Sequence, residues 1–291
     1  MTVTDSDENE IEASRAPLMD HLIELRQRLI RCAFALVAGF ILCFAFSNQI
    51  YLFLLGPFER AADLIAAQHA SGHRGYFDLL LAVTGIHPVP HAQSATVNLI
   101  YTEPLEWFFT KVKLAGFGAI VIAFPVLAFQ LYGFVAPGLY RRERNAFLPF
   151  LIAAPVLFLL GAALVYFIML PFVLWFSLSQ QISHAGSVSI QLLPKVSDYL
   201  TLVTSLLLAF GLCFQLPVIL ALLGMAGIVN TQMLTAVRRY AIVGVFIVAA
   251  VLTPPDPVSM MTLALPGLLL YEISILCVRL IERKRDKEEL A

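Results

Sequence analysis

Two glutamates of this chain lie among arginines, and carboxylates in that setting bind guanidinium groups. Glu24 lies in the string HLIELRQRL, and Glu143 lies between Arg142 and Arg144. An ionised carboxylate can accept two parallel hydrogen bonds from the planar fork of an arginine. Glu24 also has Arg28 four residues further on, at the spacing of an ion pair on a helix surface. The residues alone leave two interpretations open: structural ion pairs within the chain, or a site for an arginine-bearing ligand.

The other side chains that could carry chemistry form no known site. His69 and His73 are four residues apart, but no third metal ligand lies near them, so we expect no metal site. The four cysteines are widely separated in apolar stretches and are expected to be small buried side chains. The chain has no GxSxG string and no glycine-rich phosphate loop. These observations predict a protein that is not an enzyme and that uses no cofactor.

The composition indicates a membrane protein. Hydrophobic residues make up 59% of the chain and charged residues only 13%, whereas about a quarter of the residues of soluble domains are charged. The mean hydropathy is +0.83, and a net charge of −1 does not suggest nucleic-acid binding. A spanning helix needs about 20 mostly apolar residues. Spans are predicted at residues 32–46, 114–136, 147–176, 199–228, 240–252 and 258–278. The predicted class is an all-α polytopic membrane protein with six transmembrane helices.

The basic residues predict the orientation of these helices. Of the 19 lysines and arginines, 14 lie in the N-terminal segment, the C-terminal tail, and the second and fourth connections between spans. Because connections rich in Lys and Arg stay in the cytoplasm, both termini are predicted to be cytoplasmic. The predicted organisation is a cytoplasmic segment with an amphipathic helix at 1–31, a transmembrane domain at 32–278 and a cytoplasmic tail at 279–291. Its long external loop, 48–111, is predicted to contain a short helix at 77–86 that lies at the interface or caps the bundle.

Four strings along the chain resemble one family in the same order. They are HLIELRQRL at 21–29, FVAPGLYRRER at 134–144, AFGLCFQLP at 209–217 and LTPPD at 252–256. Together they resemble TatC, the receptor subunit of the twin-arginine protein translocase. The resemblance implies a multi-pass protein of the bacterial cytoplasmic membrane that binds the twin-arginine signal peptides of folded cargo proteins. It also implies export driven by the proton-motive force, the single-span partners TatA and TatB, and self-association in a multi-copy complex within the lipid.

The resemblance also implies which residues bind the signal peptide. They are Glu24, Glu143, Arg26, His21, Leu25 and Phe134. The two glutamates would accept the two guanidinium groups of the signal, and Arg26 would hold Glu24 and the loop in place. Phe134 and the leucine face of the N-terminal helix would supply an apolar surface for the rest of the peptide.

The fourth predicted span contains one strongly polar side chain, Gln215, between Phe214 and Leu216 and two residues before Pro217. Many members of the resembled family carry a glutamate at this position. Proline leaves a carbonyl of the preceding turn without its donor, so the amide could bond that carbonyl or a neighbouring helix of the bundle. Alternatively it faces lipid and, with Phe214 and Pro217, docks a TatA or TatB helix.

The last predicted external turn, Pro254, Pro255 and Asp256, matches that of the family.

The alternative function from the residues alone is a secondary transporter or a channel for a small solute. Such proteins keep ionisable side chains near the middle of the membrane and often show inverted repeats. The predicted spans are almost free of charge and show no repeat, which favours the translocase.

Overall fold

The computed structural model describes the backbone of residues 5–71, 99–135, 144–179, 182–185, 188–190, 194–252 and 257–289. It describes the side chains of residues 22–65, 99–133, 150–179, 194–252, 257 and 259–283. Glu143, the predicted external turn at 254–256 and the predicted short helix at 77–86 lie outside the described residues.

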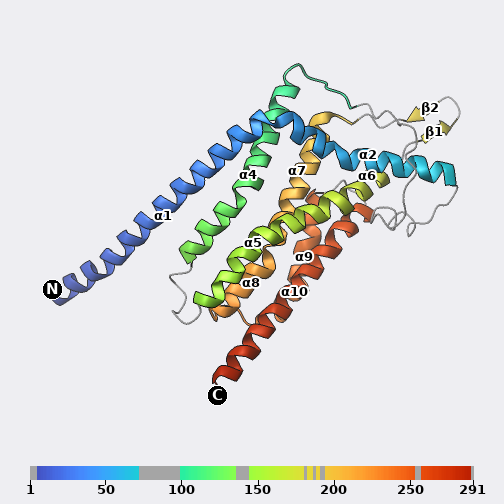
Figure 1. The fold of residues 1–291 in the computed structure, drawn as a ribbon. Helices are drawn as coiled ribbons and strands as arrows, with labels where there is room; N and C mark the ends of the chain where they lie inside the picture. Colours follow the sequence, from blue (N-terminus) through green and yellow to red (C-terminus); the bar gives the residue numbers. More distant parts are fainter. Residues whose placement is uncertain are drawn as a thin grey trace.

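The described chain is almost entirely helical, as predicted (Figure 1). The α-helices are α1 (Asp5–Ala45), α2 (Ser47–Ser71), α4 (Glu106–Val135), α5 (Arg144–Leu164), α6 (Leu170–Ser179), α7 (Val196–Cys213), α8 (Leu216–Met225), α9 (Thr231–Leu252) and α10 (Pro257–Glu289). A π-helix, Val165–Met169, joins α5 to α6. The strands β1 (Ile182–Ala185) and β2 (Val188–Ile190) form a short antiparallel pair, which the sequence did not predict.

Six segments are long and apolar enough to cross a membrane, which confirms the predicted number of spans. They are Leu22–Ala45, Glu106–Gly133, Phe150–Ser179, Val196–Met225, Thr231–Leu252 and Ser259–Arg283. Most helices extend beyond the predicted spans because helical hydrogen bonds continue through charged residues at which an apolar run stops. Thus α1 continues through the predicted boundary at residue 31, and α10 through that at residue 278. The fourth span is the exception at its end, since it stops at Met225 and not at 228. The fourth span is broken at 214–215, between α7 and α8, just before Pro217, which has no N–H to donate.

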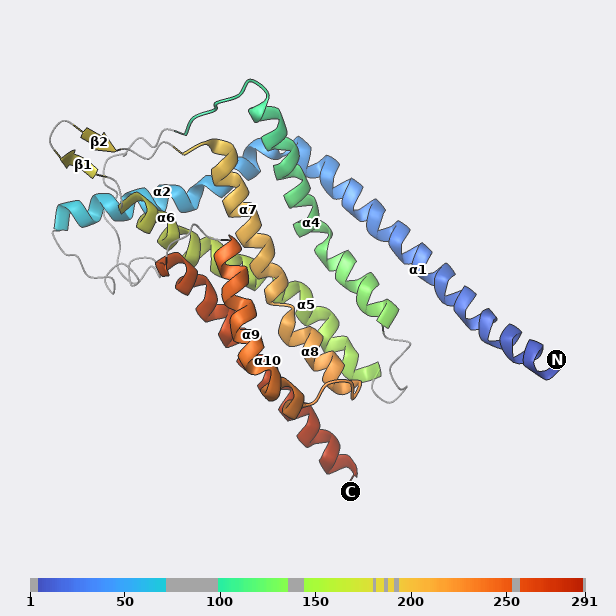
Figure 2. The ribbon, with the colours of Figure 1, turned by 180° about the vertical axis from the view of Figure 1, so that it is seen from behind.

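The helices form an open arrangement with α1 and α4 at one edge and α9 and α10 at the other (Figures 1 and 2). The start of α1 and the end of α10 lie at the same end of the bundle, and α2 crosses the opposite end. Small residues allow α1 and α4 to approach closely. A Cβ added at Gly39 would lie 3.2 Å from the backbone of Ala119, and one added at Gly118 would lie 2.6 Å from the sulfur of Cys43. In lipid, such close backbone packing is a main source of helix association.

The centre of the bundle lies where α5 and the π-helix pack on α7. Val165, Val203 and Leu206 are completely buried there. Gly161 of α5 and Gly211 of α7 make the contact possible at the end toward α8. A Cβ at Gly211 would lie 2.5–2.9 Å from three ring atoms of Phe158, and that ring is itself stacked on Phe124 with centroids 3.9 Å apart.

Gly211→Ala should therefore lower the free energy of unfolding by about 1–3 kcal/mol, since the enclosed Phe158 ring has no room to move. Thermal unfolding of the purified protein in detergent measures the effect. Gly244→Ala is the matched control, because a Cβ at Gly244 would meet nothing within 4 Å. Equal melting temperatures for the two variants would contradict the proposed close contact.

Candidate functional site

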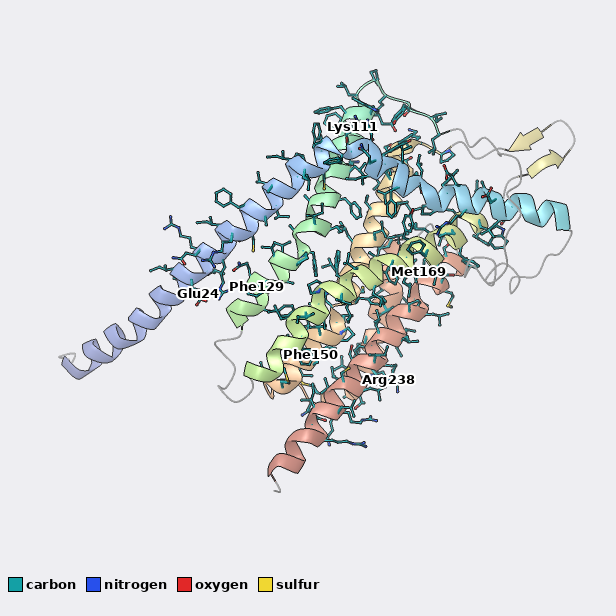
Figure 3. The ribbon with its side chains drawn as sticks, in the orientation of Figure 1. Glu24, Lys111, Phe129, Phe150, Met169 and Arg238 are labelled. Carbon is teal, nitrogen blue, oxygen red and sulfur yellow. The ribbon has the colours of Figure 1, made fainter. Side chains whose placement is uncertain are left out.

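Glu24 lies on the side of α1 that faces the end of α4 (Figure 3). Its Oε1 atom accepts hydrogen bonds from Arg28 Nε at 3.0 Å and from Arg28 Nη2 at 2.6 Å. This confirms the ion pair predicted from the spacing of the two residues. The Glu24 side chain is 38% exposed, and its Oε2 atom accepts from no described donor. The carboxylate is thus held by one edge and open at the other.

Arg28 also connects this carboxylate to α4. Its Nη1 atom donates to the backbone oxygen and to the side-chain oxygen of Gln130, both at 3.4 Å. A Cβ at Gly133 would lie 2.5 Å from the same Nη1 atom, so a glycine there leaves the space that the guanidinium occupies. The position of Glu24 is therefore set by two helices, through Arg28.

The sequence did not indicate Gln130 or Gly133. The family resemblance implied that Arg26 holds Glu24 and the loop in place. In the structure Arg28 holds Glu24, and Arg26 is exposed. The signal for Gln130 was present, because it is the one amide side chain between Lys113 and Val135. Its contact with Arg28 depends on how α1 and α4 cross, which no local pattern contains.

The remaining predicted site residues are partly described. Leu25 is 41% exposed on α1, next to other exposed leucines, which fits the predicted apolar surface. His21 lies in α1 and Phe134 in the last turn of α4, but their side chains are outside the described set. Glu143 belongs to the segment between α4 and α5, and its position remains a prediction.

Two other acidic side chains at the same end of the bundle are engaged in joining α9 to α10. Glu272 pairs with Arg238 at 2.5 Å, far across the bundle from Glu24 (Figure 3). Glu282 accepts from the backbone N–H of Thr231 at 2.8 Å and from the hydroxyl of the same residue. Within the described residues, no group of three His, Cys, Asp or Glu side chains could hold a metal ion. Among the described acidic residues at this end, Glu24 is the one that does not join α9 to α10.

Gln215 lies inside the bundle, so the lipid-facing alternative is wrong. The residue is only 5% exposed, Phe214 is 6% exposed and Pro217 is buried. Gln215 Nε2 donates to the backbone oxygen of Ala154 on α5 at 2.8 Å, as in the alternative of a bond to a neighbouring helix. An amide that faces hydrocarbon would have no partner, and this bond removes that cost. Its Oε1 atom is buried and has no donor among the described residues.

Comparison with known proteins matches this chain to one family over most of its length. The family described as Sec-independent protein translocase protein (TatC) matches residues 20–266. The TatC protein of Magnetococcus marinus is 42% identical over 277 residues, which cover 95% of this chain and 89% of that protein. The TatC protein of Escherichia coli K12 is 31% identical, and the match covers 94% of this chain and 92% of that protein.

Solved structures agree with the sequence match. A crystal structure of the twin-arginine translocase receptor TatC superimposes with a TM-score of 0.68 at 31% identity, covering 90% of this chain and 99% of that one. A second crystal structure of that receptor, in the detergent DDM, has the same TM-score at 32% identity. Since sequence and fold agree over most of the chain, this protein belongs to the TatC family of Sec-independent protein translocase proteins, multi-pass proteins of the bacterial inner membrane.

Proposed function

We propose that this chain is the subunit of a twin-arginine translocase that receives the signal peptides of folded proteins, and that Glu24 binds one arginine of the signal. The observation that carries the proposal is the half-open Glu24 carboxylate, which Arg28 holds by one oxygen only. An arriving guanidinium can bond the Oε2 atom, which accepts from no described donor, and then compete for Oε1. A lysine offers a compact ammonium without this planar fork, which explains a preference for arginine.

Glu143 is the proposed second carboxylate. The segment that contains it begins where α4 ends, and α4 ends near Glu24 (Figures 1 and 3). Two acids near the membrane surface would match the two guanidinium groups of the signal. The exposed leucines of α1, including Leu22 and Leu25, support contact with the apolar part of the signal peptide.

The proposed setting is the one that the family implies. Both termini face the cytoplasm, consistent with the start of α1 and the end of α10 lying at one end of the bundle. TatA and TatB are the proposed partners, and the proton-motive force is the proposed energy source. In the most apolar 18 residues of the spans of α1 and α9, only 11% of the residues are buried within the chain, which supports association with further helices in a multi-copy complex.

Glu24→Gln should weaken binding of a twin-arginine precursor by roughly 10- to 100-fold, because a charge-assisted hydrogen bond is worth about 1.5–3 kcal/mol. Glu143→Gln should have a similar effect. Crosslinking of a titrated precursor to the protein in native membranes measures the affinity, with a Lys-Lys precursor as the control ligand.

Glu272→Gln is the control variant for this experiment, since Glu272 pairs with Arg238 across the bundle. It should leave precursor binding unchanged. Normal crosslinking by the Glu24→Gln, Glu143→Gln double variant would refute the two-carboxylate site.

Arg28→Gln should strengthen precursor binding, by about 10-fold, because it removes the guanidinium that occupies Glu24 Oε1 in the resting protein. The same change should reduce discrimination against a Lys-Lys precursor, since a less shielded carboxylate attracts any cation. The crosslinking titration gives both affinities. Weaker binding would instead show that Arg28 serves to orient Glu24.

Docking of a partner helix at Gln215, Phe214 and Pro217 remains a proposal, and it requires α5 to move away first, because these residues are buried in the bundle. The Gln215 Oε1 atom, which has no donor among the described residues, would then accept from the arriving helix. Gln215→Leu should leave precursor binding unchanged and reduce transport and crosslinking to TatA and TatB. Gln215→Glu is the matched control, because a protonated carboxyl retains a donor for the Ala154 carbonyl and an acceptor oxygen. Full transport by the leucine variant would restrict Gln215 to its bond with Ala154.

A further inference from the structure

A cavity of about 450 Å³ opens between the first turns of α4 and α7, at the end of the bundle opposite to Glu24. Its volume is within the range of small-molecule binding sites. Glu106, the first residue of α4, lines this cavity. One Glu106 oxygen accepts from the N–H of Ser197 at 3.3 Å, and the other accepts from the N–H of Thr102 at 2.7 Å. Glu106 is thereby engaged in joining the two helix starts.

A buried hydroxyl beside this cavity has no hydrogen-bond partner among the described residues. Thr110 is 5% exposed, and its Oγ1 atom makes no hydrogen bond with any described residue. Thr110 lines both the main cavity and a smaller one of about 10 Å³ that continues from it between α4 and α7. The other threonines of the smaller cavity are satisfied, since Thr201 and Thr204 donate to carbonyls of their own helix. The orphan hydroxyl therefore indicates a polar ligand that the described part of the chain does not supply.

The cavity lies at the depth of lipid headgroups. From Leu114 to Gly133, α4 has 20 uncharged residues, about 30 Å of helix, which equals the thickness of the hydrocarbon core. The cavity residues of α4 precede this run. Lys111 lies at this end of α4 (Figure 3), with its ammonium 3.9 Å from the centre of the Trp107 ring. A Trp and Lys pair of this kind is typical of the membrane interface.

The cavity is lined by charges of both signs, two ammonium groups and three carboxylates. Lys113 and Lys195 contribute two ammonium groups, and Glu103 and Asp198 contribute two carboxylates besides the engaged Glu106. The ion pairs found between described residues lie elsewhere, so neither lysine is neutralised within that part of the chain. A matching ligand carries one anionic and one cationic group, both able to hydrogen-bond.

We propose that this cavity binds the headgroup of an aminophospholipid, with the phosphate on Lys113 and Lys195 and the primary ammonium on Glu103 and Asp198. The phosphate oxygens would also give Thr110 the partner that it lacks. Phosphatidylglycerol supplies no ammonium for the two carboxylates. The quaternary ammonium of phosphatidylcholine has no N–H to donate.

Native mass spectrometry of the purified full-length protein, with lipids of identical acyl chains, tests the proposal. The protein should retain phosphatidylethanolamine in preference to phosphatidylcholine and phosphatidylglycerol. Lys113→Gln should reduce that retention by about 10-fold, whereas Lys111→Gln, which does not line the cavity, should leave it unchanged. Equal retention of the three lipids, or equal losses in the two variants, would overturn the proposal.

Two further variants keep the test independent of folding defects. Glu103→Gln should shift the preference toward phosphatidylglycerol, a change of selectivity that a misfolded protein would not show. Thr110→Val should raise the melting temperature of delipidated protein, because it removes an unsatisfied hydroxyl, and should reduce stabilisation by added phosphatidylethanolamine. An unchanged lipid preference in Glu103→Gln would contradict the ammonium contact. Displacement of the lipid by excess inorganic phosphate would assign the cavity to a free anion and overturn the lipid assignment.

Discussion

The hydrocarbon core contains no water, so a polar group within it must find its partner in the protein. In this chain, side chains of one helix satisfy the backbone of another. Pro57 cannot donate to the carbonyl of Phe53 in α2, and the hydroxyl of Tyr166 donates to that carbonyl at 2.6 Å. Gln215 likewise donates to Ala154. Two further tyrosines make bonds of this kind, Tyr199 to Leu54 and Tyr271 to Leu234. These bonds link α2 to the π-helix and to α7, the end of α7 to α5, and α9 to α10.

The pair of α1 and α4 is held differently, and this difference creates the candidate site. Its helices approach through small residues along the apolar run, and near its end Arg28 reaches from α1 to Gln130. A guanidinium is tolerated there because the Arg28 side chain is 20% exposed and Glu24 supplies a counter-charge. The same contact leaves the Glu24 side chain 38% exposed. The contact that joins the two helices thus also occupies one oxygen of the carboxylate that we propose for binding.

The two ends of α4 have complementary roles. One end receives Arg28 at Gln130 and Gly133, and the other starts at Glu106, which is bonded to the start of α7. About 30 Å of uncharged helix separates the two ends. A headgroup bound near Lys113 would hold one end of this helix at a set depth. The rigid helix would then set the depth of Glu24 in the opposite leaflet.

The amino-acid pattern by itself determined the membrane class, the six spans and the Glu24–Arg28 pair, because these depend on local composition and on helical spacing. It also contained the strings that place the chain in its family. Only the tertiary structure decided which groups the polar side chains form hydrogen bonds with. The positions of Gln130 and Gly133 against Arg28, and the inward turn of Gln215, depend on how helices distant in sequence cross. In the membrane, every helix face is similarly apolar, so periodicity does not distinguish a face toward lipid from a face toward the bundle.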